Sequence, residues 1–244
     1  MSFAVDDATE TLRRRVLNGE FPPGAKLREV AVAEELGVSR TIARLAMSGL
    51  EHEGLLTREP NRGCRVNYFS IQQIVEAIEV RGELEAMAAR QASERGLDRA
   101  MADRLSAIVA REEALLQNGV QGAEARAEWV ALNVRFHEAM IEASGNWAVR
   151  VAIRQMWRLP LVSPDAFIFE PKDAAKSRLQ LLAAHEDHVE ILHAVQARQG
   201  HRAEARMREH ACASARNKRS NLADPEAQAL TRGLPGGALV RADL

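Results

Sequence analysis

The chain has 244 residues and a formal net charge of -1, so it is long enough for two domains that each bury a core and is not basic overall. Aromatic residues make up only 4% of it, while Ala, Leu, Arg and Glu dominate, which favours helix over sheet. No apolar run approaches the roughly 18 residues that span a membrane, and the N-terminus has no basic stretch followed by an apolar one, so we expect a cytoplasmic protein. Cys64 and Cys212 have no close partner of the metal-binding type and are interpreted as reduced thiols.

Residues 7–18 are predicted to form an amphipathic helix, because Ala8, Leu12 and Val16 recur on one face. A Pro-Pro-Gly turn at residues 22–24 follows and cannot continue a helix. This turn is expected to lead into a second, shorter pair of helices.

That pair has the build of a helix-turn-helix. Val30, Ala33 and Leu36 are apolar at helical spacing. Gly37 follows, where the backbone can take a positive φ, and Ser39 is placed to cap the next helix. Two helices joined by such a short turn are typical of DNA-binding proteins.

The second helix of the pair would carry Arg40, Thr41 and Arg44 near its N-terminus. A recognition helix uses these positions to touch base edges in the major groove, with Arg suited to guanine and the Thr methyl group to thymine. An ordinary helical hairpin with solvated arginines is the alternative, because short helix-turn-helix patterns have many false positives.

A wing is predicted directly after this helix. Residues 55–58 and 64–67 read as two short strands around a turn-rich tip. Arg58, Arg62 and Arg65 would point from this hairpin toward the backbone or minor groove of a duplex that lies against the helix.

The motifs in this region resemble those of the GntR-type bacterial transcription regulators, over about residues 8 to 67. The resemblance rests on Phe21-Pro22-Pro23-Gly24-Ala25-Lys26-Leu27, Leu36-Gly37-Val38-Ser39-Arg40-Thr41, Arg44, Leu50-Glu51, Glu53-Gly54-Leu55 and Asn61-Arg62-Gly63. It implies a winged helix whose Arg40, Thr41, Arg44 and wing-tip Gly63 approach DNA. The full set of predicted DNA-binding residues is Arg28, Ser39, Arg40, Thr41, Arg44, Arg58, Arg62 and Gly63.

The rest of the chain reads as helix, beginning where Ser70 can cap a long helix. Helices are predicted at about 71–95, 98–118, 123–144, 146–159, 176–199 and 202–219. Residues 160–173 are predicted to be a long irregular connection that covers one end of the bundle. We therefore predict a mostly α fold: a winged helix-turn-helix over 1–69, an antiparallel bundle of about six helices over 70–220, and a flexible tail over 221–244.

Polar residues interrupt the apolar faces of three bundle helices. Asn133 and His137 lie in or beside the apolar stripe of the third, and His188 and His210 lie on those of the last two. The last two helices are antiparallel across Gly200, and a rise of about 1.5 Å per residue brings their histidines to nearly the same height. Three imidazoles and an amide could form the first shell of a divalent transition metal. The alternative is that each is a core histidine bonded to a carbonyl or a carboxylate.

Arg81 is predicted to share the inward face of its helix with Glu85. It is either a structural i,i+4 ion pair or a guanidinium ready to bind a carboxylate. His185 competes with His188, since it lies one turn earlier on the same face. Four other residues lie on the polar faces of their predicted helices and are expected to be exposed: His52, His193, His201 and Arg135.

The second half also resembles a known domain, the all-helical ligand-sensing (FCD) domain of the FadR branch of the GntR family, over about residues 71 to 215. The resemblance rests on Val80-Arg81-Gly82-Glu83-Leu84-Glu85, Asn133-Val134-Arg135-Phe136-His137, Ser144-Gly145-Asn146, Glu186-Asp187-His188-Val189-Glu190 and Met207-Arg208-Glu209-His210. It implies a metal, Zn or Ni, held by Asn133, His137, His188 and His210. It further implies a small organic acid beside that metal, with Arg81 in the effector site. Asp is commoner than Asn at the first position. The chain also resembles the vanillate-responsive repressors of this branch, through the runs Ala184 to Leu192, Met207 to Asn217 and Ala238 to Asp243, which suggests an aromatic or other small carboxylic acid.

Three functions follow from these observations. The first is a homodimeric, ligand-gated repressor that reads a palindromic operator in double-stranded DNA. The second is a helical-bundle metalloenzyme in which His137, His188 and His210 hold the metal and Glu85 is the acid or base. The third is a DNA-binding scaffold without an effector, in which the histidines are structural.

Overall fold

The computed structural model of the protein describes residues 2–60, 63–169 and 174–241. Within these ranges the chain divides into two compact units. The first consists of the chain up to Ile74, the short stretch Arg158–Leu161 and the chain from Asn221 onward. The second consists of Val75–Trp157 and Val162–Ser220. The division therefore falls inside a helix rather than at residue 69, and the end of the chain belongs to the first unit.

The first unit is a winged helix with additions. Its helices are α1 (Ser2–Leu17), α2 (Glu29–Leu36), α3 (Arg40–His52), α10 (Pro225–Thr231) and the 3-10 helix η1 (Gly237–Leu239). Its strands are β1 (Lys26–Leu27), β2 (Leu56–Glu59), β3 (Gly63–Val66), β4 (Phe69–Ser70) and β5 (Val240–Arg241). β3 lies between β1 and β2 and is antiparallel to both, so the two predicted wing strands are confirmed to within about a residue.

The turn between α2 and α3 forms as its residue types predict. Gly37 has a φ of 64° and ends α2. Ser39 then caps α3 by accepting a hydrogen bond on Oγ from the Ile42 amide at 3.3 Å. Met47 and Leu50 on α3 pack with Leu12 of α1 in a fully buried core, so the opposite face of α3 is left for solvent.

The end of the chain contains regular structure, where the sequence predicted a flexible tail over residues 221–244. Asp224 caps α10, with Pro225 in its first turn. β5 pairs in parallel with β4, in the register Phe69↔Val240. Leu239 is fully buried in the core of the winged helix. Sequence periodicity missed this segment because its elements are short and are stabilised by contacts with residues far earlier in the chain.

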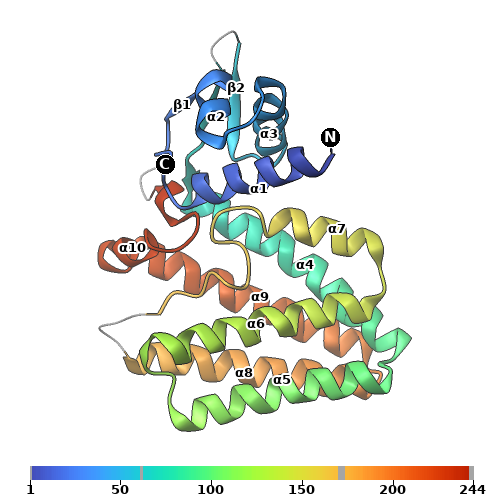
Figure 1. Ribbon diagram of the computed structural model, residues 1–244. Helices are drawn as coiled ribbons and strands as arrows, with labels where there is room; N and C mark the ends of the chain where they lie inside the picture. Colours follow the sequence, from blue (N-terminus) through green and yellow to red (C-terminus); the bar gives the residue numbers. More distant parts are fainter. Residues whose placement is uncertain (1, 61–62, 170–173, 242–244) are drawn as a thin grey trace. The chain divides into compact units, whose positions relative to one another are not determined.

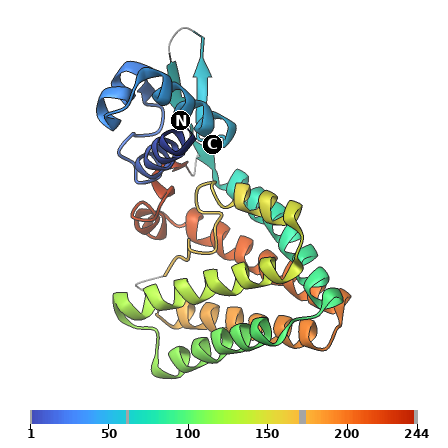
Figure 2. The same cartoon turned by 45° about the vertical axis from the view of Figure 1, so that its right-hand side comes forward.

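The second unit is a helical bundle, seen from two sides in Figures 1 and 2. Its helices are α4 (Ile71–Arg95), which begins in the first unit, α5 (Arg99–Asn118), α6 (Gly122–Ser144), α7 (Trp147–Met156), α8 (Ala174–Gln196) and α9 (Gly200–Ala223), which ends there. α5 packs against both α6 and α8, and the fully buried Trp129 and Phe136 of α6 lie in the core that they share. The bundle has the six helices that were predicted for it, and α1 to α3 and α10 bring the α-helices within the described ranges to ten.

The irregular connection is also confirmed as far as residue 169, because no helix or strand lies between α7 and α8 in the described part. Both cysteines are free. Among the residues that the structure describes, no helix combines the length and the apolarity that a membrane crossing requires.

Candidate DNA interface and histidine centre

The N-terminal half of α3 presents polar side chains to solvent. Arg40, Thr41 and Arg44 are all exposed, because Ala43 and the residues that follow it at helical spacing turn into the core. Within the described ranges, neither arginine has an ion-pair partner. Two unpaired guanidinium groups at the start of a capped helix are suited to contact phosphates or the acceptor atoms of guanine.

The wing adds fewer free cations than the sequence suggested. Arg58 donates a 2.8 Å hydrogen bond from Nε to Glu51, and Arg65 is paired with Glu59 at 2.5 Å. Arg62 lies outside the described residues, so its predicted role stays a prediction.

The packing of the first residue of β3 explains why position 63 is a glycine. Gly63 has a φ of 87°, and a Cβ there would collide with the carbonyl oxygen of Leu27. Arg28, the next residue after Leu27, is exposed at the N-terminus of α2 and lies beside this glycine. The predicted positions Arg28 and Gly63 are therefore neighbours in space.

Three histidines converge inside the bundle. His137 on α6, His188 on α8 and His210 on α9 are all buried, and one ring nitrogen of each lies within 4.8 Å of the others. The ring centroids of His188 and His210 are 4.9 Å apart, and those of His137 and His210 are 5.4 Å apart. The convergence predicted from helix heights is thus present in the structure.

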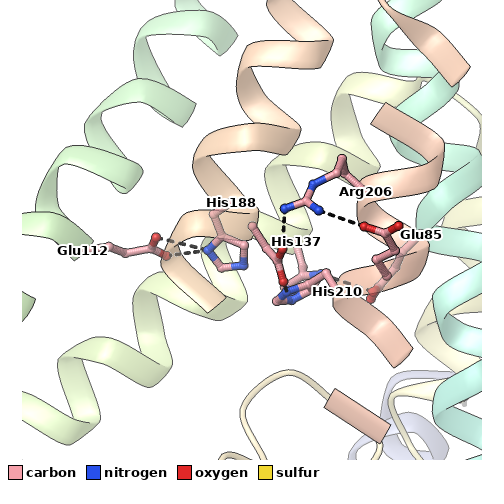
Figure 3. A network of polar contacts seen from close by, with 8 residues as sticks. Glu85, Glu112, His137, His188, Arg206 and His210 are labelled. Atoms are coloured by element: carbon pink, nitrogen blue, oxygen red, sulfur yellow. Dashed lines mark hydrogen bonds and ion pairs between the residues drawn. The ribbon is translucent and has the colours of Figure 1, made fainter. Parts of the chain in front are cut away.

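A carboxylate lies at the Nδ1 atom of each histidine (Figure 3). Glu112 Oε1 on α5 lies 3.0 Å from Nδ1 of His188, and Asp187 Oδ2 lies 3.2 Å from Nδ1 of His210. Glu85 Oε2 on α4 lies 3.2 Å from Nδ1 of His137. At His188 and His210 the carboxylate is within hydrogen-bond geometry, so it places the ring proton on Nδ1 and leaves Nε2 as a lone-pair donor. Nδ1 of His137 lies near Glu85 but has no hydrogen-bond partner.

Burial sets the charge of these groups. It lowers the pKa of the His210 imidazole to about 4, with the hydrogen bond to Asp187 only partly opposing it. Burial also lowers the pKa of His137, against the opposing effect of Glu85. For the Glu85 carboxyl, burial raises the pKa, but Arg81 and His137 outweigh it and bring the pKa to about 2. His137 and His210 are therefore neutral near pH 7, which is the form that binds a metal.

The donor set fits a divalent transition metal. Nε2 of His188 is buried and has no hydrogen-bond partner, and neither carboxylate oxygen of Glu85 has one. Two nitrogens that bind one tetrahedral ion at about 2.0–2.1 Å lie roughly 3.4 Å apart, so 4.8 Å requires only small side-chain movements. A metal ion would give the unpaired nitrogen a partner.

The remaining predicted ligands lie close to this cluster but are occupied. Asn133 is one turn before His137 and donates from Nδ2 to the carbonyl oxygen of Pro164 at 2.8 Å. Arg81 is buried, lies 3.5 Å from Glu85 through Nε, and donates from Nη1 to the Val162 carbonyl oxygen. Arg81 can therefore still be a structural partner of Glu85, because the ion pair exists. It can also bind the carboxylate of a ligand, because the other side of its guanidinium contacts only a neutral carbonyl group.

His185 is not part of the cluster. It is half-buried, and its Nδ1 lies 3.3 Å from Glu112, on the far side of the carboxylate that His188 also contacts. The residues predicted to be on the surface are all exposed: His52, His193, His201 and Arg135.

Sequence reasoning missed two groups that orient the histidines, Glu112 and Asp187. The signal for Glu112 was present, since it falls on the apolar stripe of α5 with Leu105, Ile108 and Leu115 and is itself fully buried. An acidic residue on an apolar stripe indicates a partner inside the core.

Two family models match the chain. The model described as "Bacterial regulatory proteins, gntR family" matches residues 4–66, and the model described as "FCD domain" matches residues 76–212, which is more than half of the chain. The chain belongs to the GntR family of regulators and carries an FCD domain. Both models lie where the sequence resemblance placed a winged helix and a ligand-sensing bundle.

Relatives of this GntR-family chain are also regulators. It is 30% identical over 138 residues to "Uncharacterized HTH-type transcriptional regulator YdhC" of Bacillus subtilis (strain 168). This alignment covers 55% of this chain and only 58% of YdhC. It is 30% identical over 176 residues to "Probable D-xylose utilization operon transcriptional repressor" of Paenarthrobacter nicotinovorans, covering 70% of this chain and 74% of that protein. The solved structure of E. coli McbR/YncC has a TM-score of 0.59 and 22% identity, covers 85% of this chain and 93% of that chain, and supports the fold.

These comparisons decide against one of the functions considered above. The families and relatives are transcription regulators and not enzymes, so the metalloenzyme interpretation is not favoured. The names of these relatives do not support the expected likeness to vanillate-responsive repressors. A GntR-family regulator with an FCD domain remains, and the comparisons do not decide whether it has an effector.

Proposed function

We propose that this GntR-family regulator is a homodimeric, ligand-gated repressor that binds a palindromic operator in double-stranded DNA. The observation that carries the proposal is the presence of two sites in one chain: unpaired arginines at the start of a solvent-facing helix, and a buried cluster of three imidazoles. The first suits a DNA groove, and the second suits a metal with a small ligand. One relative is named as a probable repressor, which supports repression rather than activation of transcription.

In this proposal, His137, His188 and His210 hold a divalent metal, Zn or Ni, with Asn133 as a further neutral ligand. A metal bound by these residues would supply a positive charge for an acid. The carboxylates at the Nδ1 atoms keep the rings oriented and Nε2 free to bind. Arg81 receives the carboxylate of the effector, a small and preferably aromatic acid, through the face that now meets the Val162 carbonyl.

Ligand binding would act on DNA affinity through the dimer. Two winged helices read the two half-sites of a palindrome only when their recognition helices have the spacing of successive major grooves. An acid that binds one dimer geometry better than another shifts the population toward that geometry. The effector would then release the operator by changing the spacing of the two copies of α3.

The DNA-binding part is tested with the promoter region of the protein's own gene. A footprint locates the operator, and affinity is then measured for Arg40→Ala and Arg44→Ala. Each change should cost about 1–3 kcal/mol and relax the sequence preference. Arg99→Ala is the matched control, since this side chain is 96% exposed on the bundle. Unchanged operator affinity in both variants would show that α3 is not the recognition helix.

The metal part is tested with protein purified without a nickel column. Metal analysis and titration with Zn²⁺ or Ni²⁺ should give one site per chain, and His188→Ala should abolish it. His201→Ala removes an imidazole that is 97% exposed and should leave it intact. If the native protein takes up no metal, or if both variants behave alike, the histidines are structural.

The effector part is tested by thermal unfolding and operator binding in the presence of small acids. Vanillate is the first probe, and vanillyl alcohol, which has the same ring but no carboxylate, is its control. A stabilising acid that also weakens operator binding would identify the effector class. No response to any acid by metal-loaded protein would favour the scaffold without an effector.

A further inference from the structure

Three polar side chains from three different helices donate to one short piece of chain. Arg81 on α4 donates to the carbonyl oxygen of Val162, Asn133 on α6 to that of Pro164 at 2.8 Å, and Lys218 on α9 to that of Ala166. The acceptors are alternate residues, 162, 164 and 166, and all five residues from Val162 to Ala166 belong to the second unit. We name these five residues the carbonyl strip.

Two of the three donors are buried cations, and Lys218 has no carboxylate at ion-pair distance within the described ranges. Lys218 is 7% exposed and Arg81 is 2% exposed. Arg81 has Glu85 at 3.5 Å, but Nε of Arg81 has no hydrogen-bond partner, whereas Lys218 has only the Ala166 carbonyl as its described hydrogen-bond partner. A carbonyl dipole compensates a buried ammonium group much less well than a carboxylate does.

The surroundings of Lys218 disfavour its ammonium form. Burial lowers the pKa of the Lys218 amine to about 7, Arg81 lowers it further, and Asp165 opposes both. Asp165 is exposed, so its charge is largely screened by water. An anion placed between Arg81 and Lys218 would satisfy both groups at once.

The carbonyl strip is held by few bonds of its own. Two short-range backbone hydrogen bonds lie in or beside it, from Ala166 N to Ser163 O at 3.1 Å and from Phe167 N to Asp165 O at 2.9 Å. Leu161, the residue before the strip, has a φ of 58°, which costs a residue with a Cβ roughly 1 kcal/mol. Burial of the Val162 and Ala166 side chains and the three donors together hold the strip in place, and of these contacts the three donors can take another acceptor.

We propose that the carbonyl strip occupies the positions that the oxygen atoms of an organic acid take on Arg81, Asn133 and Lys218, and that the acid replaces it. This inference rests on the proposed function and adds Lys218 to the ligand site. The geometry asks for an acid with a carboxylate for the two cations and a second oxygen, a hydroxyl or another carboxylate, for the amide of Asn133. The class is thus hydroxy acids or dicarboxylic acids.

Replacement of the carbonyl strip by an acid would also move the residues that precede the strip. The chain runs without a break from the strip back into Arg158–Leu161, which belongs to the first unit. In that unit, Arg158 is paired with the buried Glu53 at the end of α3, at 2.9 Å. Movement of the strip therefore pulls on a segment that is bonded to the recognition helix.

The test uses the full chain labelled with ¹³C at the ε carbon of lysine, so that each of the four lysines gives a separate NMR signal. Lys218 is assigned with Lys218→Arg, and Lys26, whose side chain is half exposed, serves as the internal control. L-Malate and vanillate are the probes, with vanillyl alcohol and chloride at the same ionic strength as controls. Malate should raise the titration midpoint of Lys218 by about one unit and leave that of Lys26 unchanged.

A second measurement follows the strip itself. Hydrogen exchange at the Ala166 and Phe167 amides should increase at least about tenfold when malate binds, because the strip has left its donors. Lys218→Gln keeps a donor for the Ala166 carbonyl but removes the charge, so malate should bind at least about tenfold more weakly to it. Lys26→Gln should bind malate normally.

The outcomes separate this inference from the proposed function. If neither malate nor vanillate moves the Lys218 signal or the exchange of the strip, the inference is wrong, even when an acid releases the operator. If malate moves both while no acid affects operator binding, the ligand site stands and the proposed gating of DNA falls. If Lys218→Gln binds malate as the native protein does, Lys218 is a structural residue.

Discussion

Replacing Glu53 by alanine should destabilise the winged helix strongly. Glu53 is the C-cap residue of α3, and its carboxylate accepts two hydrogen bonds from Arg13 of α1, each at 2.6 Å. Arg158 donates to the same carboxylate at 2.9 Å. The change leaves the Arg13 guanidinium buried beside α3 without its main counter-charge.

The magnitude follows from burial. The side chains of Glu53 and Arg13 are 4% and 10% exposed, and removing one partner of such a pair costs about 3–5 kcal/mol. The Arg158 side chain is 45% exposed, so Arg158→Ala should cost less than about 1 kcal/mol. Glu20→Ala breaks the comparatively exposed pair with Arg15 and is the matched control, also expected below about 1 kcal/mol.

Hydrogen exchange followed by mass spectrometry measures this cost in each unit separately. Because about 1.4 kcal/mol is a factor of ten, peptides of α1 and α3 in Glu53→Ala should exchange at least about 100-fold faster, with α5 of the bundle as an unchanged reference. An increase below tenfold, or one no larger than that of Glu20→Ala, would refute the claim that this buried pair holds α3 to α1.

Three further changes test other contacts. Gly82→Ala puts a Cβ into collision with that of Ala211, so urea unfolding should show a loss of about 1–3 kcal/mol, and a neutral result would contradict the close crossing of α4 and α9. Leu239→Ala should cost the first unit about 2–5 kcal/mol by calorimetry, since this side chain is fully buried, and no loss would show that the end of the chain does not anchor there. Glu112→Gln should weaken Zn²⁺ binding about 10-fold to 100-fold in competition with a chelating dye, whereas Glu113→Gln, on the exposed face, should leave it unchanged; equal affinities would exclude an orienting role.

Much of this protein could be predicted from local signals. A glycine followed two residues later by a serine marks the turn between α2 and α3, because positive φ and N-capping depend on the residues themselves. His188 and His210 could be placed at one height because helix rise is constant and the two helices meet at Gly200. Arg81 and Glu85 were expected on one inward face for the same reason.

What the sequence by itself determined is therefore most of the helices, the winged helix-turn-helix and the equal height of His188 and His210, since these follow from backbone geometry over short distances. That His137 on α6 meets these two histidines was decided by the packing of the helices. Only the tertiary structure decided that Glu112 meets His188, that Lys218 and Arg81 bind one strip of carbonyls, and that β5 returns to pair with β4. These contacts join residues tens to more than a hundred positions apart. They depend on how the helices pack and where the connections run, which local propensity does not encode.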